Sequence, residues 1–184
     1  MNTVIFDLEC NGLLHDVTHL HCIALYSKED DQLTSYNDEC DWKNPTPTKK
    51  GMESPIVRAL QYIEQAHYII GHNIVQFDIP VIKSIYPWFN PVGTIVDTLI
   101  LSRLYHPDLF DIDKKRKYKY MLQQMYGRHS LEAWGYRLGE YKGSFSKTTD
   151  WKEWRQDMED YCIQDVVVTK KLCDHFHPYL SGSR

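Results

Sequence analysis

The hydrophobic pattern of the first 40 residues predicts three short strands. Residues 3–9 and 20–27 are apolar runs bounded by turn-forming residues, and residues 32–36 form a third short segment with strand-forming side chains. Runs of this length between turns are typical of β-strands. Because the connections between them are short, we expect an antiparallel meander.

After a polar segment at residues 41–51, the pattern changes to an alternation of helices and strands. Ser54 followed by Pro55 predicts a helix start, and apolar side chains at helical spacing continue to about residue 66. Further helices are expected at 77–85, 99–105, 130–138 and 151–176, and further strands at 68–70 and 94–96. This order predicts an α/β fold in which helices flank a mixed central sheet.

Composition narrows the class of protein. The chain has 184 residues, of which 42% are hydrophobic and 25% charged, so we expect one globular domain over residues 1–184 rather than disorder. Its five cysteines form no regular framework, and their odd number suits a reducing compartment. Neither a signal peptide nor an apolar run of about 18 residues is visible, so we predict a cytoplasmic protein without membrane contact.

Two acidic residues interrupt the first predicted strand. Asp7 and Glu9 are two positions apart, so their side chains point to one side, while Val4, Phe6 and Leu8 take the other. An exposed strand face or a salt bridge would also explain such a pair. The apolar flanks, however, are those of a buried strand, which makes both acids candidate functional residues.

A third acid interrupts the last predicted helix. Its apolar stripe has Asp165 where a core side chain is due, and Tyr161 lies one turn earlier on the same face. Asp78 follows Phe77 at another predicted helix start, where the helix dipole alone would favour an acid. Carboxylates that gather without partners repel one another unless a cation neutralises them, and all-oxygen ligand sets suit Mg²⁺ or Mn²⁺.

Three motifs carry a resemblance to a known family. "FDLE", "HNIVQFD" and "YCIQD" resemble, in order and spacing, the motifs of the DEDD exonuclease superfamily. Tyrosine four positions before the last acid is similar to the DEDDy branch; the histidine branch would have His at position 160, which is Asp here. "VDTLILSRLYH", "HSLEAWGYRLGEYKG" and "DYCIQDVVVTKKL" resemble the N-terminal proofreading domain of family A replicative DNA polymerases from short-tailed phages.

This resemblance, which extends from residue 3 to about residue 176, implies a ribonuclease H-like fold. It also implies a 3'-to-5' DNA exonuclease that releases nucleoside 5'-monophosphates with the help of two divalent metal ions, Mg²⁺ or Mn²⁺. Asp7 would bridge both metals, and Glu9 and Asp165 would hold the metal that carries the attacking water. Asp78 would serve the second metal, and Tyr161 would orient the water.

Substrate contacts are predicted at two places. Asn73 and Phe77 belong to the second motif and lie next to Asp78. Residues 103–128 carry seven basic and three acidic side chains on a chain of net charge −4. Their centre combines cations that could follow a phosphate backbone with a tyrosine that could stack on a base, although a solvated loop would look similar. The predicted contacts there are Lys114, Lys115, Arg116, Lys117 and Tyr118.

Several alternatives remain open from the sequence. Substrate specificity for RNA, as in a 3'-to-5' exoribonuclease or oligoribonuclease, depends on contacts to the 2'-hydroxyl that motifs do not reveal. A non-catalytic nucleic-acid-binding module or polymerase subunit would have no chemical reason to keep all four acids. The chain carries no polymerase region, so it is either an excised domain or a separately encoded exonuclease with a DNA polymerase as partner. We expect single-stranded or frayed 3' ends of DNA as substrate, in proofreading or DNA degradation.

Overall fold

The computed structural model describes residues 2–37, 54–116, 118–140 and 152–183, and the structural statements below concern these residues. Its sheet has five strands in the order β3-β2-β1-β4-β5. β1, β2 and β3 form an antiparallel meander, whereas β4 and β5 are parallel to β1. The strands are β1 (Thr3–Cys10), β2 (Leu20–Ser27), β3 (Gln32–Asn37), β4 (Tyr68–Gly71) and β5 (Thr94–Asp97). The predicted mixed sheet is therefore confirmed.

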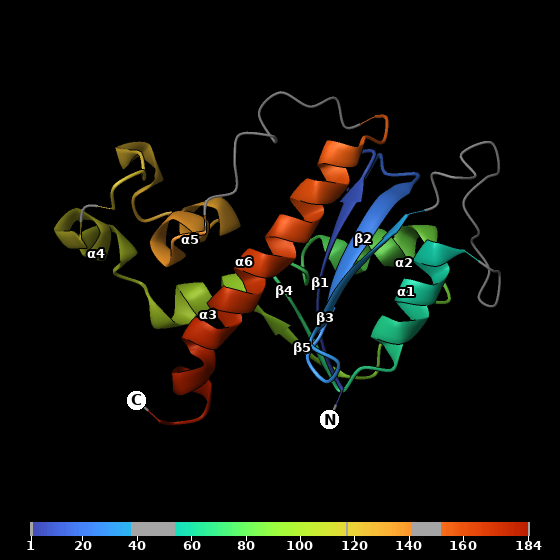
Figure 1. Cartoon of the computed structure of the whole chain (residues 1–184), viewed down its shortest axis with the longest axis horizontal. Helices are drawn as coiled ribbons and strands as arrows, with labels where there is room; N and C mark the ends of the chain where they lie inside the picture. Colours follow the sequence, from blue (N-terminus) through green and yellow to red (C-terminus); the bar gives the residue numbers. More distant parts are fainter. Residues whose placement is uncertain (1, 38–53, 117, 141–151, 184) are drawn as a thin grey trace.

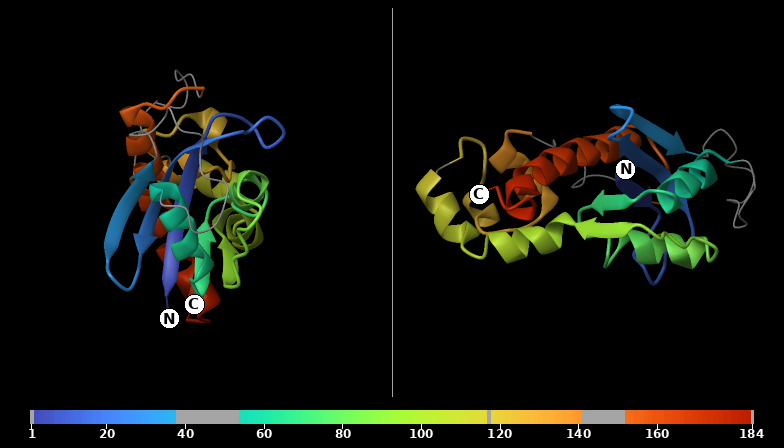
Figure 2. Two further views of the ribbon diagram at one scale, coloured as in Figure 1. Left: turned by 90° about the vertical axis from the view of Figure 1, so that its right-hand side faces the viewer. Right: turned by 90° about the horizontal axis from the view of Figure 1, so that it is seen from below.

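Helices cover both faces of this sheet (Figure 2). α1 (Pro55–Glu64) and α2 (Asp78–Ile85) pack on one face, and α6 (Gln156–Leu180) packs on the other. α1 begins as predicted, because the Ser54 hydroxyl accepts a hydrogen bond from the Val57 amide at 3.1 Å. For every predicted helix except α6, both ends lie within a few residues of the observed ends.

β1 is the strand on which the two layers meet. Val4, Phe6 and Leu8 are buried in the core that α1 and α2 complete. Ile5 points the other way and packs against Cys162 of α6. The alternation predicted for residues 3–9 is therefore confirmed, and Asp7 and Glu9 share the face that α6 covers.

The remaining helices form a group beside the C-terminal half of α6 (Figure 1). They are α3 (Thr98–Tyr105), α4 (Leu109–Arg116), a short 3-10 helix (Gln123–Met125) and α5 (Leu131–Leu138). The Ser130 hydroxyl caps α5 by accepting a hydrogen bond from the Ala133 amide at 3.4 Å. A shared apolar core holds the group against α6, and its members are Leu109, Leu131, Trp134, Val168, Leu172 and Phe176.

Two predictions of local structure were wrong. α4 was not predicted, and the basic residues Lys114, Lys115 and Arg116 form its last turn rather than a loop. This helix has little apolar periodicity, and its stability comes from packing of Leu109 and from cations at its C-terminus, which the helix dipole favours. α6 begins at Gln156 and ends at Leu180, later at both ends than expected. Among the described residues, no helix is both long and apolar enough to cross a membrane.

Candidate active site

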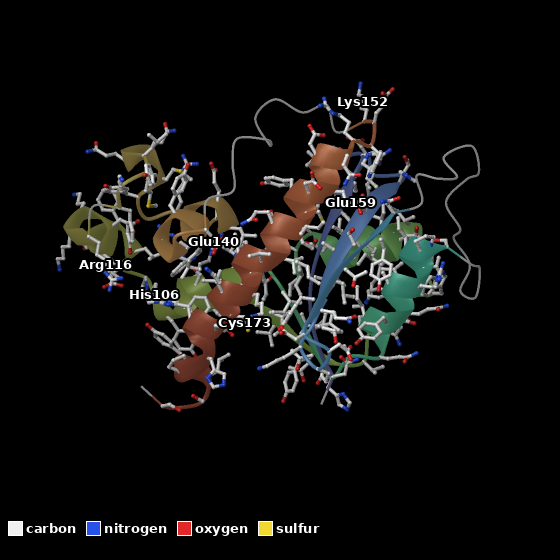
Figure 3. The ribbon with its side chains drawn as sticks, viewed as in Figure 1. His106, Arg116, Glu140, Lys152, Glu159 and Cys173 are labelled. Atoms are coloured by element: carbon white, nitrogen blue, oxygen red, sulfur yellow. The ribbon has the colours of Figure 1, made fainter. Side chains whose placement is uncertain are left out.

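Asp7 and Glu9 lie half-buried under the N-terminal half of α6. One ligand atom from each of Asp7, Glu9 and Cys162 lies within 4.8 Å of the other two. The position of α6 over β1 is fixed in part by Asn37 at the end of β3, whose side-chain amide donates to the Glu159 carboxylate at 2.6 Å (Figure 3). The structure thus brings the two acids of β1 close enough together to share a cation.

Cys162 is fully buried and belongs to the core rather than to a ligand set. Its Sγ donates a weak hydrogen bond to the carbonyl oxygen of Asp7 at 3.4 Å. Burial raises the pKa of this thiol well above its usual value, a hydrogen bond with Cys22 adds to the rise, and the negative charges of Asp7 and Glu9 contribute a smaller part. Since metals bind the thiolate, the group offers carboxylate oxygens as its ligands, which is the donor set that Mg²⁺ and Mn²⁺ prefer.

Asp165 lies one helical turn beyond Tyr161 on α6. Its side chain is buried, with 7% of its surface exposed, between the core residues Cys162 and Val168. Tyr161 itself is half-buried. The predicted interruption of the apolar stripe is therefore real: an acid occupies a core position on the face of α6 that packs against the sheet.

Asp78 is the first residue of α2 and is almost fully buried. Burial raises the pKa of its carboxyl to about 7, and the negative charges of Asp97 and Asp165 contribute to the rise. Hydrogen bonds from its own amide and from that of Leu8 act in the opposite direction. Asp78 thus lies against β1 and within electrostatic reach of Asp165. Because it is buried there, its carboxyl group is half protonated near neutral pH.

The pKa of the Cys10 thiol, at the end of β1, responds to the charges of the nearby acids. Burial raises its pKa to about 11, and the charges of Glu9, Asp78 and Asp7 raise it further. Three acids from β1 and α2 therefore act on one buried group. Together with the effect of the Asp165 charge on Asp78, this indicates that the four acids lie within electrostatic reach of one another, although only Asp7 and Glu9 lie close enough to share one cation.

Asp97 holds the loop that carries Asn73. Its carboxylate caps α3 by accepting a hydrogen bond from the Leu99 amide at 2.9 Å. It also accepts from the amides of Asn73 at 2.9 Å and Val75 at 3.1 Å, across more than 20 residues of chain. Asn73 takes a left-handed backbone conformation with φ of 69°. These bonds position the turn before Asp78, a role that no local pattern in the sequence reveals.

A pocket of about 280 Å³ lies beside the acids. Phe77, which the sequence predicts as a substrate contact, forms part of its wall together with Glu9 and Leu13. Leu13 has 63% of its surface exposed, an unusual position for a large apolar side chain next to charged groups. Sequence reasoning missed Leu13; its only signal is an apolar residue directly after the turn at Asn11 and Gly12.

The basic run lies far from this pocket. α4 and the sheet occupy opposite ends of the longest axis of the molecule (Figures 1 and 2). Lys114, Lys115 and Arg116 are exposed on α4, Tyr118 is half-buried beside Met121 and Met125, and Lys117 lies outside the described residues. The structure therefore does not bring the described residues of this run to the acids, and contact of the whole run with a nucleic acid stays a prediction.

Comparison with known proteins assigns the family. The profile of the RNase H superfamily matches residues 4–177. The chain belongs to this superfamily. It is also 31% identical over 194 residues to the DNA-directed DNA polymerase of Enterobacteria phage T3, and 31% identical over 193 residues to that of Escherichia phage T7. In both cases 93% of this chain aligns with 26% of the relative, so the chain spans about a quarter of the length of these polymerases.

Solved structures confirm the fold of this superfamily member. A structure described as the apo form of the nuclease superposes with a TM-score of 0.60 at 20% identity, covering 94% of this chain and 70% of the other. NrnC of Brucella melitensis, solved with bound Mg²⁺, gives 0.60 at 20% identity and covers 98% and 74%. The family B DNA polymerase of Pyrobaculum calidifontis gives 0.54 at 13% identity, covering 98% of this chain and 25% of the polymerase.

Proposed function

We propose that this chain is a metal-dependent 3'-to-5' exonuclease that acts on DNA and releases nucleoside 5'-monophosphates. The observation that carries the proposal is that Asp7 and Glu9 lie close enough to share a cation beside an apolar pocket, with Asp78 and Asp165 within electrostatic reach. Kinship with phage DNA polymerases, over the quarter of their length that this chain spans, favours DNA over RNA as substrate. Removal of mismatched nucleotides alongside a DNA polymerase, or breakdown of DNA, would use the same chemistry.

The four acids have the composition of a two-metal site. Asp7, Glu9, Asp78 and Asp165 would hold two divalent cations, Mg²⁺ or Mn²⁺, which supply a water of lowered pKa and stabilise the leaving oxygen. Tyr161, one turn before Asp165, carries a hydroxyl that would orient the attacking water. Two buried thiols close to the acids, Cys10 and Cys162, have raised pKa values, which make both poor nucleophiles.

The pocket beside Glu9 fits the terminal nucleotide of a strand. Its apolar side chains, Phe77 and Leu13, would contact the base, while Glu9 lies at the edge where a phosphodiester would meet the metals. Stacking and apolar contact tolerate every base, as a sequence-independent exonuclease requires. Asn73 lies on the same loop as Phe77, and its backbone amide donates a hydrogen bond to Asp97, which holds it in place. The Asn73 side chain would contact the sugar or phosphate.

Degradation of labelled strands tests the polarity and the sugar preference. The purified chain is incubated with Mg²⁺ and either DNA or RNA of one sequence, labelled at the 5' end, as single strand and as duplex. We expect a descending ladder on DNA that EDTA abolishes. Immediate release of the labelled 5' nucleotide would show that degradation proceeds from the 5' end. A ladder on RNA alone would show that the substrate is RNA rather than DNA. No products on any strand would refute the proposal.

Matched substitutions on α6 test the site itself. Asp165→Ala removes a buried acid, and Asp160→Ala removes an exposed acid from the same helix. We expect Asp165→Ala to lower the rate of hydrolysis at least 1,000-fold, which corresponds to a loss of about 4 kcal/mol of transition-state stabilisation. Asp160→Ala should leave the rate unchanged. Asp7→Ala should behave like Asp165→Ala. Equal rates for the two α6 variants would exclude Asp165 from the reaction.

A further inference from the structure

A second cavity, larger than the pocket beside Glu9, lies among the helices α3 to α6. Its volume is about 490 Å³, and six of its lining residues carry the argument: His106, Arg116, Tyr118, Arg137, His175 and Tyr179. His175 is ten residues beyond Asp165 on α6, which corresponds to about 15 Å along the helix axis. Figure 3 shows His106 and Arg116 near the junction of α3 and α4, well away from Glu159 at the other end of α6. The cavity is therefore separate from the four acids.

Arg137 is the central charge of this cavity. Only 3% of its side chain is exposed, and Asp113, which is fully buried, accepts hydrogen bonds from its Nε at 2.9 Å and its Nη2 at 2.7 Å. Asp113 is held in turn by the Gly127 amide at 2.8 Å. The guanidinium group is thus locked in one orientation before any ligand arrives.

Nη1 is the nitrogen of this guanidinium group that Asp113 does not bind. No residue that the structure describes accepts a hydrogen bond from Nη1 of Arg137, although this atom is buried. A buried charged donor without an acceptor is costly, because water has been removed and nothing replaces it. Arg137 lines the cavity with only 3% of its side chain exposed, so an anionic oxygen in the cavity would reach Nη1 once the side chains that cover this atom are displaced. The exposed guanidinium of Arg116, on α4, adds a second positive charge at the same cavity.

The rest of the wall is aromatic. The Nε2 atoms of His106 and His175 are 2.9 Å apart, and their rings pack at 5.1 Å between centroids. The Tyr179 hydroxyl approaches His106 Nε2 at 3.4 Å, and the Arg137 guanidinium lies 5.0 Å from the centroid of the Trp134 ring. Flat side chains that surround fixed cations suit a ligand with both a planar ring system and a negative charge.

We propose that this cavity binds a nucleotide, with its phosphate on Arg137 and Arg116 and its base against the aromatic wall. A volume of about 490 Å³ falls within the range of roughly 300 to 1,000 Å³ of small-molecule sites. An inorganic anion alone would leave most of the aromatic wall without contact. The shared chemistry is that of a free nucleoside monophosphate or of one nucleotide within a single strand that continues past the acids.

Calorimetric titration in EDTA isolates the cavity from the metal-dependent site. Without metal, the four acids repel a phosphate, so binding of deoxyadenosine 5'-monophosphate reports the cavity and does not depend on hydrolysis. We expect this nucleotide to bind at least tenfold more tightly than either deoxyadenosine or inorganic phosphate, because only the nucleotide engages both halves of the cavity. Absence of binding at millimolar concentration would overturn the proposal, and would leave the proposed exonuclease activity untouched.

Two variants and one control locate the site. Arg137→Met combined with Asp113→Leu replaces the buried ion pair by apolar side chains, which keeps packing while it removes the anion donor. We expect this double variant to weaken nucleotide binding at least tenfold, and Arg116→Ala to weaken it roughly fivefold. Arg103→Ala removes the same charge from α3 without touching the cavity and should bind normally. If the double variant fails to fold by circular dichroism, Arg116→Ala decides; equal affinity in all folded variants would overturn the proposal.

Competition identifies the source of the nucleotide. A single-stranded trinucleotide is titrated in EDTA into the original chain and into Arg116→Ala. If the trinucleotide displaces the mononucleotide and loses affinity in the variant, the cavity holds a nucleotide of the substrate strand. If only the mononucleotide binds, the cavity holds a free nucleotide, such as the product of hydrolysis. Either result supports a nucleotide site and fixes its role.

Discussion

Asp78 provides the most direct test of the acid cluster, because its burial links stability to pH and to metal. The perturbation is Asp78→Asn, which keeps the shape of the side chain and removes its charge. Folding raises the pKa of the Asp78 carboxyl from 3.8 to about 7, chiefly through burial. In the metal-free protein the folded state therefore favours the protonated form of this group, whereas the unfolded chain ionises it freely.

The sign and size of the effect follow from that difference. A carboxyl whose pKa is raised on folding gives its full stability below its unfolded value and loses it as the pH rises towards the folded value. For Asp78 this window extends from about pH 4 to about pH 7. Each unit of pKa corresponds to about 1.4 kcal/mol, so the free energy of unfolding falls by at most roughly 4 kcal/mol across the window. The Asp78→Asn variant has no carboxyl to titrate at this position and escapes this loss.

Urea denaturation in EDTA at intervals between pH 4 and pH 8 measures the prediction. The difference in free energy of unfolding between Asp78→Asn and the original chain removes the contribution of all other titrating groups. We expect this difference to be near zero at pH 4 and to favour the variant by several kcal/mol at pH 8, on the order set by the pKa difference. Exposed Asp160→Asn is the control and should show no trend.

Metal provides the second half of this test. Millimolar Mg²⁺ or Mn²⁺ at pH 8 should restore stability to the original chain, because the cation binds the folded acids and not the unfolded chain. The same addition should stabilise Asp78→Asn much less. A stability difference that stays flat from pH 4 to pH 8, or an identical response of both proteins to metal, would refute the assignment of Asp78 to a charged, metal-binding cluster.

Three further predictions concern stability, each measured by urea denaturation at pH 7. Asp97→Asn turns one acceptor oxygen of this side chain into a donor, so we expect the free energy of unfolding to fall by about 1–3 kcal/mol. The pKa of Asp78 should also fall, because the charge of Asp97 is removed. An unchanged urea midpoint would contradict the role of Asp97 in holding the loop that carries Asn73. Arg137→Ala leaves the buried Asp113 without its partner and should cost about 3–5 kcal/mol, whereas replacing both residues by Met and Leu should recover most of that loss. Gly93→Ala would drive a methyl group into the backbone carbonyl of Ala66, so we expect more than about 3 kcal/mol of destabilisation; a loss of only about 1 kcal/mol would mean that the turn relaxes.

The sheet was predictable because its signal is local. In β1 the alternation of side chains sends Val4, Phe6 and Leu8 to one core and leaves Asp7 and Glu9 on the opposite face, and the structure agrees. Such alternation depends only on the two-residue period of a strand. α4 escaped prediction for the opposite reason. Its sequence is mostly charged, and it is helical because Leu109 joins a core supplied by helices distant in sequence.

For the site, the sequence revealed which residues are unusual but not how they are held. The acid at position 165 interrupts an apolar stripe, and this interruption is visible in the sequence alone. The pairing of Asp97 with the Asn73 amide joins segments more than 20 residues apart, and the bidentate pairing of Arg137 with Asp113 spans a similar distance. A charged residue looks the same in sequence whether it is solvated or locked in a buried pair, so these contacts emerge only from the tertiary fold.

The two charged regions of the molecule are built on opposite electrostatic principles. At the end of β1, like charges are held together by apolar packing on both sides of the strand, and Asp78 shows the cost through its raised pKa. Among α4 and α5, Asp113 neutralises Arg137 and only one nitrogen is left over. Neutralising an acid of the first region should therefore abolish activity and stabilise the fold, whereas breaking the ion pair of the second should destabilise the fold. Opposite stability changes in the two sets of variants would follow from this difference alone.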